Sequence, residues 1–213
     1  MREEKVFIPC GKIQLEGLIS IDEALSFRGG VILCHPHPQY GGDMHNVVIT
    51  AAIEAASQEG LSTLRFNFRS VGESGGTYEE GVGEKEDVAA VVEYFSSKLH
   101  DANASFILLG YSFGAWAGLP VAIEDRRIDG MVAIAPPLEL YDFDFLKGCK
   151  KRKLFIAGDR DTFCPVSLLE IWYQYVEEPK SLTIIPGADH FFFFHTHLLI
   201  QPLREFFSLL QGK

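Results

Sequence analysis

The stretch FILLGYSFGAWAG, residues 106–118, carries the pattern G-x-S-x-G between an apolar run and a run of small residues. The apolar run predicts a buried strand and the small residues predict a closely packed helix, so the pattern forms the turn between them. A serine at such a turn is held in strained backbone geometry with its hydroxyl projecting outward, and the flanking glycines leave room for the neighbouring strand and helix. We therefore predict that Ser112 is a nucleophile at the end of a strand.

Short apolar runs and helical patterns alternate on both sides of this stretch. Residues 6–8 and 13–19 predict an opening antiparallel pair at a sheet edge. Further strands, buried on both faces, are predicted at 31–35, 61–68, 106–109, 131–134, 154–157 and 182–185. Helices are predicted at 47–58, 84–99, 113–123, 166–176 and 197–210. The expected fold is α/β, with about eight strands in a mostly parallel sheet and helices on both faces.

Length and composition restrict the class of protein. The 213 residues, 47% of them hydrophobic, predict a single domain over residues 1–213. Lys and Arg number 19 against 29 Asp and Glu, and the net charge of −10 argues against nucleic acid as a partner. We expect no membrane partner, because the longest apolar run, 191–200, is too short to span a bilayer. The absence of a signal peptide and four scattered cysteines are typical of a cytoplasmic protein, while the oligomeric state stays unknown.

Two later loops supply partners for the serine. A serine hydroxyl needs a base, and the base needs a third group that fixes its tautomer. Asp159 and Asp161 follow the strand predicted at 154–157, and His190 follows the strand predicted at 182–185. Both aspartates lie just past the strand end, and Asp159 is expected to bind loop amides instead. The order Ser112, Asp161, His190 is that of a Ser-Asp-His triad assembled at one sheet edge.

Several further motifs extend over nearly the whole chain. They are CHPHPQYGGDMHN (34–46), RFNFRSVGES (65–74), IAPP (134–137), GDRD (158–161) and PGADHFF (186–192). With the G-x-S-x-G turn, they make the chain resemble the small, cap-less bacterial serine hydrolases of the α/β-hydrolase superfamily, related to dienelactone-hydrolase-like proteins. The resemblance implies Ser112 as nucleophile, Asp161 as acid and His190 as base. Dienelactone hydrolases proper carry a cysteine at the turn, so their chemistry and substrate are not transferred to this chain.

The oxyanion that forms during acyl transfer needs two backbone donors. One is the N–H of Phe113, at the start of the helix after Ser112. The second is expected after the strand at 31–35, where Pro36 and Pro38 lack an N–H and leave His37, with the Gln39-Tyr40 amides as alternatives. As residues of the substrate pocket we predict Tyr40, Tyr141, Phe163 and Phe191. The segment 136–152 is too short for a cap domain, and its aromatic residues could edge the pocket.

The seven histidines do not match a metal site, since no acidic or cysteine ligand lies at a suitable spacing. We therefore expect no metal and no cofactor. The sequence favours a serine hydrolase of the carboxylesterase type, which acts on a small-molecule ester with a short acyl chain. An acyltransferase or a thioesterase would use the same triad, and a non-catalytic binding module with a hydrolase fold is the alternative from another class.

Overall fold

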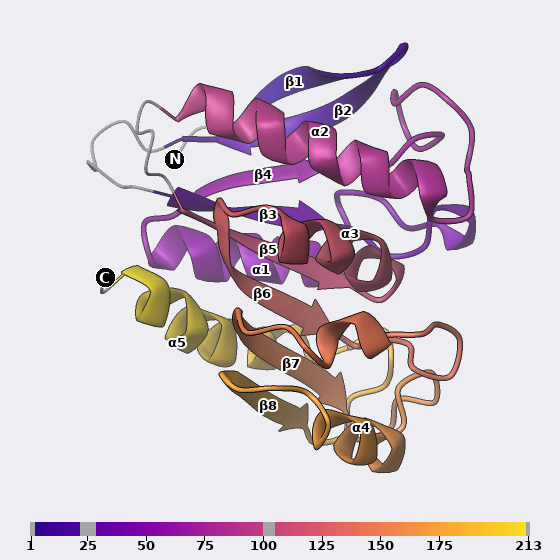
Figure 1. Cartoon of the computed structure of the whole chain (residues 1–213), viewed down its shortest axis with the longest axis vertical. Helices are drawn as coiled ribbons and strands as arrows, with labels where there is room; N and C mark the ends of the chain where they lie inside the picture. Colours follow the sequence, from indigo (N-terminus) through magenta and orange to yellow (C-terminus); the bar gives the residue numbers. More distant parts are fainter. Residues whose placement is uncertain (1–2, 22–28, 100–104, 212–213) are drawn as a thin grey trace.

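The computed structural model describes residues 3–21, 29–99 and 105–211. Its centre is an eight-stranded sheet in the order β1-β2-β4-β3-β5-β6-β7-β8 (Figure 1). The strands are β1 (Glu3–Cys10), β2 (Ile13–Ser20), β3 (Gly29–Cys34), β4 (Ser62–Phe66), β5 (Ser105–Tyr111), β6 (Ile128–Ile134), β7 (Arg152–Gly158) and β8 (Lys180–Ile185). The predicted eight-stranded α/β architecture is confirmed.

Strand direction divides the sheet into two parts. β1 pairs antiparallel with β2, and β2 pairs antiparallel with β4, whereas β3 to β8 run parallel. β1 alternates exposed and buried residues along its second half, as an edge strand does, while every residue of β3 and β4 is buried. The chain passes from β3 to β4 on one side and later places β5 on the other side of β3. This reversal is a topological switch point, where α/β sheets place ligands beyond the strand ends.

Helices cover both faces of the sheet, as predicted (Figure 1). One face is covered by α1 (Val47–Gln58) and α5 (Ile200–Gln211), and the opposite face by α2 (Val82–Lys98), α3 (Phe113–Glu124) and α4 (Val166–Tyr173). The helix predicted at 197–210 begins instead as a 3-10 turn, η3 (Thr196–Leu199), and continues as α5. Each face therefore has its own apolar core, with the sheet between them.

The segment between β6 and β7 is fully described and contains only a short 3-10 helix, η2 (Asp144–Leu146). No cap domain lies between these strands, which agrees with the predicted cap-less architecture. Throughout the described ranges, no helix is both long and apolar enough to cross a membrane.

Candidate active site

The turn between β5 and α3 consists of Ser112 alone, because β5 ends at Tyr111 and α3 begins at Phe113. Ser112 has φ 54° and ψ −119°, a left-handed conformation that costs free energy for a residue with a side chain. A Cβ at Gly110 would lie 2.4 Å from Ala115 Cα, and one at Gly114 would lie 2.2 Å from the Cys34 carbonyl oxygen. Both glycines are therefore required by close backbone approach, and they let Ser112 project from the sheet edge.

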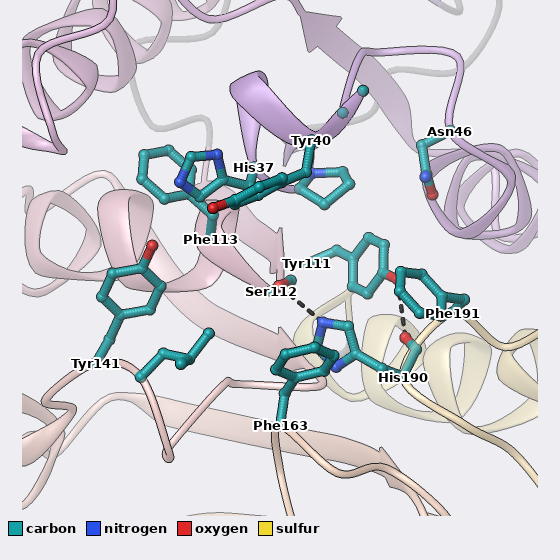
Figure 2. Close-up of a pocket in the computed structure, with 14 residues that line it drawn as sticks. His37, Tyr40, Asn46, Tyr111, Ser112, Phe113, Tyr141, Phe163, His190 and Phe191 are labelled. Atoms are coloured by element: carbon teal, nitrogen blue, oxygen red, sulfur yellow. Dashed lines mark hydrogen bonds between the residues drawn. The ribbon is translucent and has the colours of Figure 1, made fainter.

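Two hydrogen bonds join the three residues that the sequence singled out. Ser112 Oγ lies 2.9 Å from His190 Nε2, and His190 Nδ1 lies 2.8 Å from Asp161 Oδ2. All three side chains are buried. Because the carboxylate accepts a hydrogen bond from Nδ1–H, the Nε2 lone pair of the neutral ring faces the serine hydroxyl (Figure 2). In this arrangement Ser112 donates to a nitrogen that is able to take its proton.

Backbone and side-chain contacts hold His190 and Asp161 in position. The hydroxyl of Tyr111 donates to the His190 carbonyl oxygen at 2.8 Å. Asp161 Oδ1 accepts from the N–H groups of Phe163 and Cys164, which leaves Oδ2 for the histidine. The structure thus brings together Ser112, Asp161 and His190 from the ends of three strands, β5, β7 and β8.

Asp159, the competing acid, lies elsewhere. Its Oδ1 accepts the N–H of Gly187 at 2.7 Å, so it fastens the loop after β8 to the end of β7. Asp189, beside the base in sequence, accepts the N–H of Phe191 and serves as a turn residue. Both aspartates bind loop amides, the role that the sequence analysis predicted for Asp159.

The loop after β3 presents the N–H of His37 near the start of α3. The His37 carbonyl accepts from the N–H groups of Tyr40 and Gly42, and its Nδ1 accepts from the N–H of Gln39. The alternative donors Gln39 and Tyr40 are therefore already engaged. In the described chain, the N–H groups of His37 and Phe113 donate to no acceptor. Both are free to bind an incoming oxygen.

The His37 ring holds this loop in place through contacts with two other aromatic side chains. It packs on the Phe113 ring at 4.9 Å, and its Nε2 lies 3.2 Å from the Tyr78 hydroxyl. Burial lowers the pKa of His37, because it penalises the charged ring. In the neutral ring, Nδ1 accepts from Gln39 and Nε2–H donates to Tyr78. The side chain therefore has a positioning role that is separate from its backbone N–H.

A cavity of about 700 Å³ opens over Ser112 (Figure 2). All four residues predicted for the pocket lie in its wall: Tyr40, Tyr141, Phe163 and Phe191. The sequence analysis missed other wall residues, among them Tyr111, Leu140 and Asn46. Tyr111 had a signal, because it is the variable residue just before the serine of G-x-S-x-G. Leu140 and Asn46 had none, since loop conformation alone brings them to the cavity.

The aromatic side chains of the segment between β6 and β7 lie in two different environments. Tyr141 lines the cavity and stacks on Trp116 with ring centroids 4.4 Å apart. Phe143 is buried instead, against Phe145 and Trp172. The segment therefore contributes one ring to the cavity and anchors the others in the body of the protein.

The described wall of the cavity contains no Asp, Glu, Lys or Arg side chain. Two buried arginines are paired with carboxylates: Arg69 binds buried Asp87 at 2.9 Å, and Arg65 binds the exposed Glu3 at 2.8 Å. Within the ranges that the structure describes, no group of three or more His, Cys, Asp or Glu side chains is arranged to hold a metal ion. The cavity is thus mostly apolar, with the Ser112 hydroxyl, the His190 ring and two free amides at its floor.

Comparisons with known proteins agree with this geometry. A family model described as an alpha/beta hydrolase domain matches residues 29–197. An alpha-beta serine hydrolase homologue from Coxiella burnetii has a TM-score of 0.88 at 33% identity, over 96% of this chain and 97% of that one. A serine hydrolase without lid from Xanthomonas campestris has a TM-score of 0.87 at 28% identity, over 100% and 97% of the two chains. An uncharacterized protein from Rickettsia prowazekii is 32% identical over 189 residues, or 85% of this chain and 79% of that protein.

Proposed function

Because the chain belongs to the alpha/beta hydrolase domain family, we propose that it is a serine esterase that hydrolyses carboxyl esters with short acyl chains. The observation that carries the proposal is the pair of hydrogen bonds from Ser112 to His190, 2.9 Å, and from His190 to Asp161, 2.8 Å. In this proposal Ser112 is the nucleophile, His190 is the general base and acid, and Asp161 holds the ring in its reactive tautomer.

The first half-reaction forms an acyl-enzyme. Ser112 Oγ bonds to the carbonyl carbon while its proton passes to His190 Nε2. The carbonyl oxygen becomes an oxyanion and accepts hydrogen bonds from the N–H groups of Phe113 and His37. When the carbonyl reforms, the bond to the alcohol oxygen breaks, and that oxygen takes the proton back from His190. One alcohol leaves, and the acyl group remains on Ser112.

The second half-reaction repeats these steps with water. His190 takes a proton from a water molecule, which attacks the acyl carbon and forms a second oxyanion at the same two amides. Collapse of this intermediate releases a carboxylic acid and returns the proton to Ser112 Oγ. Each residue is thus restored to its starting state.

The shape and the charge of the cavity support the substrate class. A volume of about 700 Å³ lies within the usual range for sites that bind small molecules. No cap extends the cavity, because the segment between β6 and β7 lies along the body of the protein. The described wall has no Asp, Glu, Lys or Arg to pair with an ion, and a neutral ester loses less solvation on binding than an ion would.

The proposal is tested with a fluorophosphonate probe and a series of p-nitrophenyl esters from acetate to decanoate. Wild-type protein should be labelled once, on Ser112, and its kcat/KM should fall as the acyl chain outgrows the cavity. Ser112→Ala should abolish labelling and lower turnover by at least about 10⁴-fold. The matched control is Ser97→Ala, which removes an exposed hydroxyl on α2 that bonds only to its own helix.

Three outcomes would overturn parts of the proposal. Turnover of Ser112→Ala at the wild-type rate would remove the serine from the mechanism. Thioesters cleaved far faster than esters of equal length would change the substrate class. A transfer product that exceeds the free acid when an alcohol is added would identify acyl transfer as the reaction.

A further inference from the structure

Four consecutive phenylalanines follow His190, and the structure separates them. Phe192 is fully buried, whereas Phe191, Phe193 and Phe194 are exposed by 50, 60 and 95%. Phe192 and Phe194 have φ angles of 54° and 64°, a region that is unfavourable for bulky residues. The loop therefore adopts strained backbone geometry and also leaves three phenyl rings in water. Core packing explains the burial of Phe192 but not the exposure of the others.

Two phenyl rings lie against the base. The centroid of the His190 ring is 4.8 Å from that of Phe163 and 5.5 Å from that of Phe191. Both phenylalanines line the cavity, and they come from the loops after β7 and β8 (Figure 2). Phe193 continues this surface outside the cavity wall, and its ring centroid is 5.6 Å from that of Phe191. We call Phe163, Phe191 and Phe193 the aromatic platform.

The chemistry of ester cleavage determines which part of the substrate meets this surface. The departing alcohol oxygen must lie within hydrogen-bonding distance of His190 Nε2, which returns the proton. The carbonyl oxygen is directed elsewhere, toward the N–H groups of Phe113 and His37. The alcohol part of the ester thus starts at the His190 ring, where the neighbouring side chains are the phenyl rings of the platform.

From this placement we infer that the aromatic platform binds the alcohol part of the substrate, and that the preferred esters join a short acyl group to an apolar alcohol that carries a ring. The inference rests on the proposed esterase function and specifies the alcohol part of its substrate. A ring on the alcohol gains contact with Phe191 and Phe193, and aromatic pairs are more favourable than their buried area alone accounts for. The described cavity wall offers no ionic partner to a charged alcohol.

The experiment compares three alkyl esters whose leaving alcohols have similar acidity. They are propyl acetate, 3-phenylpropyl acetate and propyl 4-phenylbutanoate, which carries the same phenylpropyl group on the acyl side, with kcat/KM measured from acid release. Wild-type protein should prefer 3-phenylpropyl acetate to both others by roughly tenfold. Phe193→Ala should reduce the preference of the enzyme for 3-phenylpropyl acetate over propyl acetate by roughly two- to tenfold.

Phe194→Ala is the matched control, because Phe194 lies in the same loop and is 95% exposed but does not belong to the platform. It should leave the preference unchanged. An equal loss in Phe193→Ala and Phe194→Ala, or a wild-type preference for propyl 4-phenylbutanoate, would overturn the inference and leave the esterase function standing. Failure to cleave any of the three esters would overturn the proposed function and this inference with it.

Discussion

Two buried histidines lie at the carboxyl ends of parallel strands, His35 after β3 and His190 after β8. Their exposed fractions are 0 and 8%, and both rings use both nitrogens. His35 Nε2 accepts the Phe68 N–H at 3.0 Å, and its Nδ1 lies 2.6 Å from the Pro36 carbonyl oxygen. His190 meets a hydroxyl and a carboxylate instead.

The two histidines differ in whether their hydrogen-bond partners can transfer a proton to the ring and stabilise the resulting charge. A backbone N–H is too weak an acid to transfer its proton to an imidazole, so His35 serves as a fixed neutral link between two loops. Burial lowers the pKa of His35 to about 4. The Ser112 hydroxyl can give its proton to His190, and Asp161 stabilises the resulting cation. Burial and complete hydrogen bonding are thus common to both rings, and only the chemistry of the partners separates the structural role of His35 from the role proposed for His190.

The comparison is tested most strongly by making the same substitution at both sites. His190→Gln should lower kcat by about 10⁴-fold or more, because no base remains for Ser112. His35→Gln should keep kcat within about tenfold of wild type but lower the free energy of unfolding by about 2 kcal/mol, because a buried hydrogen bond is lost. Ester turnover and urea unfolding measure the two quantities. Loss of activity at both positions without loss of stability would mean that the two rings do not differ in this way.

A second pair of variants separates the carboxylates after β7. Asp161→Asn should lower kcat by about 10³- to 10⁴-fold, because an amide at this position no longer fixes the tautomer that leaves Nε2 open to the serine. Asp159→Asn should have a small effect on kcat, because its carboxylate holds the N–H of Gly187 rather than the base. Steady-state kinetics of both variants provide the test. Equal losses would show that loop anchoring, and not the contact with His190, accounts for the role of the acid.

The third prediction concerns acid stability. Because the folded protein holds the pKa of His35 near 4, below its usual value of about 6.5, the unfolded chain binds a proton in this interval and the folded chain does not. The contribution of neutral His35 to the free energy of unfolding is therefore fully present above pH 6.5. It falls by about 3 kcal/mol as the pH is lowered to about 4. Urea unfolding of wild type and His35→Gln at pH 7 and pH 4.5 measures it.

The deficit of His35→Gln at pH 7 should shrink or disappear at pH 4.5, because only the wild type has this histidine to titrate. Other groups that titrate in the same interval contribute equally to both proteins and cancel in the difference. A deficit that stays constant between the two pH values would contradict the assignment.

Local patterns made the fold and the reactive groups predictable, whereas the pocket depends on long-range contacts. The G-x-S-x-G stretch specifies its own turn, because Gly110 and Gly114 are the residues that close approach requires. Strand order brings Asp161 and His190 to the same edge once the sheet is parallel. Beyond Phe191, the phenylalanines after His190 could not be sorted in this way, because the loop has irregular backbone with positive φ angles at Phe192 and Phe194. Leu140 likewise reaches the cavity through the path of its loop.

The last prediction extends the comparison to a third imidazole, His37, whose backbone is proposed to bind the oxyanion while its ring only supports the loop. Tyr78→Phe removes the hydroxyl that lies 3.2 Å from His37 Nε2, and the cost of losing one neutral hydrogen bond corresponds to a roughly threefold fall in kcat. KM should change little, because the loop acts on the oxyanion more than on the bound ester. The matched control, Tyr94→Phe on α2, removes a hydroxyl far from the loop. If the ring of His37 positions its own N–H, Tyr78→Phe should lower kcat and leave thermal stability unchanged. A fall in thermal stability with unchanged kcat would instead show that Tyr78 has only a structural role.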